Sequence, residues 1–125
     1  MSCMNDSICL MKDVLKAFNE FEKSLVQAHS ISLNEAMLLC LLGEHRTKKR
    51  TGHLSASEIA EMTGFSPSHI SKILRSAESG KWISRSLCPE DKRKMHFELT
   101  ADGYEKYRQL KNTPVEVPDL LKKLI

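Results

Sequence analysis

The stretch Leu54–Arg85, "LSASEIAEMTGFSPSHISKILRSAESGKWISR", decides the fold because it carries closely spaced signals for starting and ending helices. Ser55 and Glu58 have the S-x-x-E spacing of a capping box, in which each residue binds the other's backbone N–H. Gly64 follows, and glycine is the residue that most often ends a helix. These signals predict a short helix between Ser55 and Gly64.

A second helix begins almost at once, at Ser66-Pro67. Serine is a favourable N-cap, and proline fits the first helical position, where its missing N–H is not needed. Gly80 then predicts the end of this helix. Two helices joined by a short glycine-containing turn form a helix-turn-helix.

The second helix has two chemically different faces. Ile70, Ile73, Leu74 and Ala77 follow the i, i+3, i+4, i+7 spacing of a buried stripe. The opposite face has no acidic residue and is predicted to point outward, where it can reach base edges in a major groove. The candidate DNA-contacting residues of this helix are Ser66, Ser68, His69, Ser71, Lys72 and Arg75.

The two segments that follow alternate in hydrophobicity and predict a β-hairpin. Trp82–Leu87 and Lys94–Leu99 are the strands, and the charged stretch Cys88–Arg93 is the tip. A hairpin directly after a helix-turn-helix predicts a winged helix. The fold class we predict is mainly α with a small β-hairpin wing (α+β), a winged helix-turn-helix with flanking helices.

Four further helices are predicted around this core. Apolar residues recur at helical spacing across residues 8–28, and Ser32–Glu35 has the capping-box form before an apolar segment. The glycine-bounded, basic stretch Gly43–His53 is predicted to be a loop. Thr100 can cap another helix, and a short terminal helix is predicted to start near Pro118.

The stretch from Leu54 to Gly103 resembles the MarR family of bacterial winged-helix transcriptional regulators. The paired helices quoted above, the wing motif "PEDKRK" and the following "FELTADG" carry this resemblance. It implies a single domain over residues 1–125, with residues 54–99 as the DNA-binding core and residues 8–28 and 100–125 as dimerisation helices. It also implies a homodimer, often a repressor that responds to a small-molecule effector, although the tail is shorter than is usual in the family.

The hallmark of the resemblance is Asp-x-Arg, here Asp91-Lys92-Arg93. A narrow minor groove concentrates negative potential, and an arginine on a hairpin tip can enter it while a nearby carboxylate orients the guanidinium. Lys92 and Lys94 are expected to meet phosphates, which adds affinity with little sequence information. The wing residues of the predicted site are therefore Asp91, Lys92, Arg93 and Lys94.

Composition excludes several other classes of protein. The chain has 125 residues, a formal charge of +3 and four cysteines without metal-binding or disulfide-framework spacing. No apolar run is long enough for a membrane span, and we expect a cytoplasmic protein without cofactor or metal. No nucleophile elbow, Walker loop or zinc-protease motif is present, so we do not expect an enzyme.

The sequence favours one function and leaves two alternatives open. It predicts a sequence-specific regulator that binds double-stranded DNA at a pseudo-palindromic operator as a homodimer. A winged helix could instead be a protein-interaction module without specific DNA binding, because a fold does not fix a function. Alternatively, Cys9 near the start of the first helix stands roughly where a redox-sensing branch of the family has its reactive thiol, although Asp6 would oppose a thiolate there.

Overall fold

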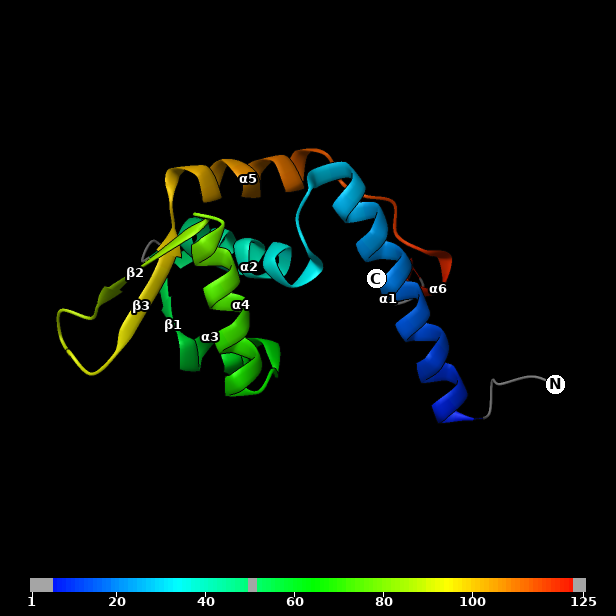
Figure 1. Ribbon diagram of the computed structural model, residues 1–125, viewed down its shortest axis with the longest axis horizontal. Coiled ribbons are helices and arrows are strands. Elements are labelled where there is room, and N and C mark those ends of the chain that lie inside the picture. Colours follow the sequence, from blue (N-terminus) through cyan, green and yellow to red (C-terminus); the bar gives the residue numbers. More distant parts are fainter. Residues whose placement is uncertain (1–5, 50–51, 123–125) are drawn as a thin grey trace. The chain divides into compact units, whose positions relative to one another are not determined.

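A computed structural model describes residues 6–49 and 52–122 (Figure 1). The chain forms two compact units: Asn34–Asn112, and Met1–Leu33 with Thr113–Ile125. The first of these units is mostly helical with a small antiparallel sheet, so the predicted fold class is confirmed.

Helix α2 (Leu33–Lys49) runs further than the sequence predicted. Residues 43–49 are helical, so the predicted loop over Gly43–His53 is wrong for this part; Arg50 and Thr51 lie outside the described residues. Position 43 has room only for glycine, because the Tyr107 ring lies where a side chain would be: an added Cβ would come within 2.6 Å of it. The Tyr107 hydroxyl also donates a hydrogen bond of 2.8 Å to Glu44 Oε1.

The sheet has three strands rather than the predicted two. β2 (Ile83–Leu87) and β3 (Met95–Leu99) form the predicted hairpin, and β1 (His53–Ser55) pairs with the other edge of β3. Leu54 of β1 lies opposite Phe97, and both side chains are buried. The additional strand therefore anchors the base of the hairpin to the core.

Helix α5 (Ala101–Asn112) starts where the hairpin ends, as Thr100 predicted. The Thr100 hydroxyl oxygen accepts a hydrogen bond of 3.0 Å from Gly103 N–H, and the Thr100 N–H donates one of 3.0 Å to the Trp82 carbonyl. Gly103 must lack a side chain, because an added Cβ would lie 1.9 Å from the same carbonyl oxygen. The hairpin and α5 are thus joined at one tightly packed point.

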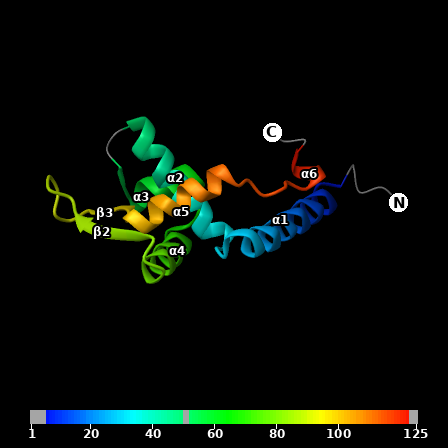
Figure 2. The same ribbon diagram turned by 90° about the horizontal axis from the view of Figure 1, so that it is seen from above.

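The second unit contains α1 (Ser7–His29) and the short helix α6 (Asp119–Lys122) (Figure 2). Asp6 caps α1 by accepting the N–H of Ile8 at 2.9 Å. At its other end, His29 Nε2 lies 2.8 Å from the Thr113 carbonyl oxygen, which ties the helix to the C-terminal segment. The large apolar side chains that α1 leaves exposed are Ile8, Leu10, Met11, Leu15, Phe18 and Val26.

Across residues 6–49 and 52–122, no single helix has both the length and the apolar character needed to cross a membrane. Only α1 and α2, taken together as a bent pair, satisfy these criteria by length and composition. Buried helices in protein cores satisfy them as well.

Candidate nucleic-acid interface

Helix α3 (Ala56–Thr63) is held at both ends by the signals seen in the sequence. Ser55 Oγ accepts the Glu58 N–H at 3.2 Å, and Glu58 Oε1 accepts the Ser55 N–H at 3.0 Å. Gly64 ends the helix with φ of 76°, a left-handed conformation that glycine adopts without strain. These caps fix the turn that leads into the next helix.

Helix α4 (Pro67–Ser79) is amphipathic, as predicted. Ser66 caps it by accepting the His69 N–H at 3.2 Å, and the Ile70, Ile73, Leu74 and Ala77 side chains are all buried. The opposite surface is polar and carries positive charge. Its exposed candidate residues are Ser66, Ser68, Ser71, Lys72 and Arg75.

The His69 side chain is less exposed than those of the other candidate residues of α4. The sequence predicted that it faces outward, but its side chain is only half-exposed. Its ring centroid lies 4.4 Å from that of Phe65, and its Nε2 lies 3.5 Å from Asn34 Nδ2 at the start of α2. The helical spacing could not reveal these contacts, because Asn34 is brought to His69 only by the tertiary fold.

The wing tip between β2 and β3 extends away from helices α3 and α4 (Figure 1). Backbone hydrogen bonds of 2.9 Å from Cys88 N–H to the Lys94 carbonyl and from Lys94 N–H to the Asp91 carbonyl shape the turn. Cys88 itself is buried, so it belongs to the core side of the wing. The charged tip is therefore an ordered turn on a paired hairpin.

Asp91 and Arg93 contact each other at this tip. Asp91 Oδ1 accepts a hydrogen bond of 3.1 Å from the Arg93 backbone and one of 3.2 Å from Arg93 Nε. These two hydrogen bonds, the backbone one first, lower the pKa of the Asp91 carboxyl below its ordinary value. The Arg93 side chain is 92% exposed, so its guanidinium is oriented by Asp91 yet fully accessible. Lys92 and Lys94 are exposed beside it.

One ion pair connects α4 to the hairpin, and the sequence analysis did not identify it. Arg85 of β2 binds Glu78 near the end of α4 through two guanidinium nitrogens: its Nε donates to Glu78 Oε2 at 2.8 Å, and its Nη2 donates to Glu78 Oε1. The hydrogen bonds from Arg85 lower the pKa of the Glu78 carboxyl. A bidentate pair restrains direction as well as distance, so it restrains the hairpin relative to α4.

Two of the cysteines that the structure describes, Cys9 and Cys40, differ in their surroundings. Cys9 lies in the first turn of α1, half-exposed, and its N–H is 3.4 Å from Asp6 Oδ1. Burial is the main cause of a raised pKa for the Cys40 thiol. In the part of the chain that the structure describes, no three His, Cys, Asp or Glu side chains are grouped so that they could hold a metal ion.

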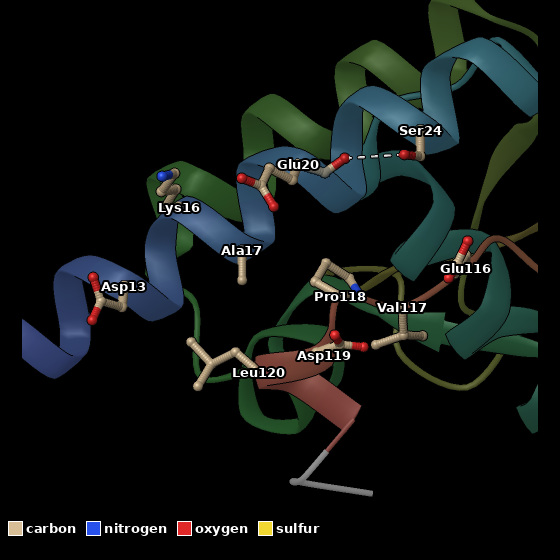
Figure 3. A pocket seen from close by; sticks show the side chains of 10 residues that line it. All are labelled: Asp13, Lys16, Ala17, Glu20, Ser24, Glu116, Val117, Pro118, Asp119 and Leu120. Carbon is tan, nitrogen blue, oxygen red and sulfur yellow. Dashed lines mark hydrogen bonds between the residues drawn. The ribbon is translucent and has the colours of Figure 1, made fainter. Parts of the chain in front are cut away.

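A recess of about 580 Å³ lies between α1 and the C-terminal segment of the same unit (Figure 3). Its apolar lining includes Ala17 and Leu120. Its charged side chains are Asp13, Lys16, Glu20, Glu116 and Asp119. This volume is within the range of small-molecule sites, but the recess contains none of the predicted DNA-contacting residues.

The sequence of this chain matches the model of one protein family. The family model described as MarR family matches residues 29–94, which is more than half of the chain. No protein of curated function matches the sequence.

Solved structures of regulators share the fold at low sequence identity. S. aureus MepR in complex with DNA is 20% identical, with a TM-score of 0.74 over 87% of this chain and 76% of that one. A mutant of E. coli MarR bound to operator DNA is 18% identical, with a TM-score of 0.70 over 90% and 78%. BpsR of Bordetella bronchiseptica, whose DNA binding is regulated by 6-hydroxynicotinic acid, is 16% identical, with a TM-score of 0.72 over 90% and 75%.

Proposed function

The chain belongs to the MarR family of winged-helix transcriptional regulators, and from this premise we propose that it binds a specific, pseudo-palindromic DNA operator as a homodimer and represses transcription. The observation that carries the proposal is the surface of α4. Its buried stripe is complete, whereas its exposed face presents hydroxyls, Lys72 and Arg75. A helix of this kind, which we call the recognition helix, suits a major groove.

The wing supports the same function by a different mechanism. Arg93 is extended, exposed and oriented by Asp91, which suits insertion into a narrow minor groove of strongly negative potential. Lys92 and Lys94 flank it and are positioned for phosphates. The recognition helix thus reads bases, and the wing supplies affinity and reads groove shape.

The exposed apolar face of α1 supports the homodimer. Ile8 is 80% exposed and Leu15 is 58% exposed, although both are large aliphatic side chains on one helix. Burying such a face against a second copy removes it from water, which favours association. In a two-fold dimer the recognition helices would meet half-sites about one helical turn apart.

We also propose that a small-molecule effector regulates DNA binding by this chain. BpsR, which shares the fold, is regulated in its DNA binding by 6-hydroxynicotinic acid. An effector of this chain would act by binding the DNA-competent and DNA-incompetent arrangements of the dimer with different affinity.

The proposal is tested by comparing variants on one selected operator and on unrelated duplexes. Arg93→Ala should weaken binding on the order of tenfold or more, because it removes the minor-groove arginine. Lys92→Ala should weaken all duplexes similarly and reduce the salt slope by about one unit, whereas Lys72→Ala or Arg75→Ala should cost about 1–3 kcal/mol on the operator and relax its specificity.

Arg108→Ala is the matched control, because it removes one exposed positive charge from α5, outside the recognition helix and the wing; its oligomeric state is measured alongside, because α5 lies in the predicted dimerisation region. It should leave operator affinity nearly unchanged. If Arg93→Ala binds DNA like the native protein but loses a protein partner, the protein-interaction module replaces the proposed function. Equal losses on every duplex from Lys72→Ala and Lys92→Ala would contradict the division between reading and phosphate contact.

A further inference from the structure

His69 occupies a distinctive place at the start of the recognition helix. It is the third residue of α4, where its backbone N–H is already bound to the capping Ser66 Oγ at 3.2 Å. The first turn of a recognition helix is where contacts to base edges concentrate. The position of the His69 ring therefore affects what this turn can offer to a base.

Two side chains from outside the helix hold this ring. Phe65 lies against it with ring centroids 4.4 Å apart and planes tilted by 36°. Asn34, in the first turn of α2, places its amide Nδ2 3.5 Å from His69 Nε2. This distance is long for a hydrogen bond, so the orientation of the ring depends on the aromatic contact as well as on the amide.

The chemistry of the amide determines the tautomer of the ring. An amide NH₂ only donates, so Nε2 must accept when Asn34 Nδ2 faces it, and an imidazole whose Nε2 accepts carries its proton on Nδ1. Within residues 6–49 and 52–122, Nδ1 has no hydrogen-bond partner. The contact therefore makes Nδ1–H the one N–H donor of the neutral ring.

We propose that Asn34 is a positioning residue for DNA reading: by occupying Nε2 of His69, it makes Nδ1–H the donor that the ring offers to an acceptor on a base edge, such as N7 of a purine. This inference rests on the proposed function of the recognition helix. Asn34 acts through His69 and does not itself contact the base. Phe65 fixes the plane of the ring, so that the donor has a constant direction.

Asn34→Asp tests the tautomer with little change in shape. A carboxylate only accepts, so it requires a proton on Nε2 and reverses the role of that nitrogen. Long-range ¹H–¹⁵N NMR of the full-length protein should be recorded at about pH 8, where ordinary imidazoles with a pKa near 6.5 are mostly neutral. The native protein should show the Nδ1–H tautomer of His69, and Asn34→Asp should show a proton on Nε2.

Base preference tests the consequence for recognition. Asn34→Asp should change the preference at one base pair of each half-site by roughly two- to tenfold, the range of one hydrogen bond. The same substitution should have no such effect when His69 is already alanine, because a residue acting through His69 loses its effect without it. Asn112→Asp, which changes the net charge equally at an exposed residue of α5, is the control and should keep the native preference; its oligomeric state is measured alongside, because α5 lies in the predicted dimerisation region.

The outcomes separate this inference from the proposed function. Unchanged ¹⁵N signals of His69 in Asn34→Asp would overturn the positioning role, even if the native protein binds an operator. An equal change of base preference in the His69→Ala background would also overturn it, because Asn34 would then act without the histidine. A native protein without any base preference would overturn the proposed function and the reading role with it, while the NMR comparison would still establish whether the two side chains interact.

Discussion

Helices α1 and α4 are both amphipathic, yet the apolar face of α4 is buried and that of α1 is exposed. In α4 the apolar stripe is closed within one chain: Ile70 is 2% exposed and Ala77 is fully buried. In α1 Ile8, Leu15 and Phe18 are between 42% and 80% exposed. The difference shows that helical periodicity identifies an apolar face but not what covers it. The face of α4 is completed by its own unit, and the face of α1 requires a second chain under the proposed function.

The largest expected effect comes from placing a charge on the face of α1. Leu15→Glu would bury an unpaired carboxylate in the dimer at a cost on the order of 4 kcal/mol, which corresponds to a dissociation constant about a thousandfold higher. Sedimentation equilibrium measures this directly. Gln27→Glu adds the same charge at an exposed polar position of α1 and should leave the dimer intact. A Leu15→Glu dimer as stable as the native one would contradict the burial of the apolar face of α1 against a second chain.

Truncating the buried face of α4 should act on folding rather than on association. Leu74 is 4% exposed, and Leu74→Ala should lower the free energy of unfolding by about 2–5 kcal/mol through lost burial and a residual cavity. Ser71→Ala, on the exposed face of the same helix, should change it by less than about 0.5 kcal/mol. Urea unfolding followed by circular dichroism compares the two. Similar losses in both variants would contradict the burial that distinguishes the faces.

The ion pair at the end of α4 should have the smallest effect on stability. Glu78 and Arg85 are partly exposed, so Glu78→Gln should lower the free energy of unfolding by less than about 1 kcal/mol. Folding lowers the pKa of Glu78 from its ordinary value of 4.5, so its contribution is present above that value and is lost as the pH falls through the lower, folded-state pKa.

A thermal-unfolding series from pH 7 to pH 3 measures this contribution. The difference between native protein and Glu78→Gln should shrink toward the acid end. A difference that grows on acidification would contradict the sign of the linkage.

The sequence predicted the elements whose signals are local. Ser55 with Glu58, Gly64, and Ser66-Pro67 each act within one turn of helix, so their effect could be read directly from the residue order. The hairpin was also predictable to within one residue at each strand, because β2 and β3 are adjacent in the chain.

The features that depend on distant residues were not predictable in this way. The helix α2 continues past Gly43, where the Tyr107 ring of α5 packs against it, and β1 pairs with the distant strand β3. The half-buried position of His69 depends on Asn34, and the bond between Glu78 and Arg85 depends on how the hairpin packs on α4. The roles of the exposed α4 and wing residues in DNA binding stay predictions.

Selection of binding sites from a random duplex library tests the central claim most directly. The purified full-length protein is used under reducing conditions at near-physiological salt, and the retained duplexes are sequenced. We predict an enriched inverted repeat whose half-sites are centred about one helical turn apart, as two recognition helices related by a two-fold axis require. Retention of duplexes without a common motif, or no retention, would contradict the claim that this winged helix reads a specific operator.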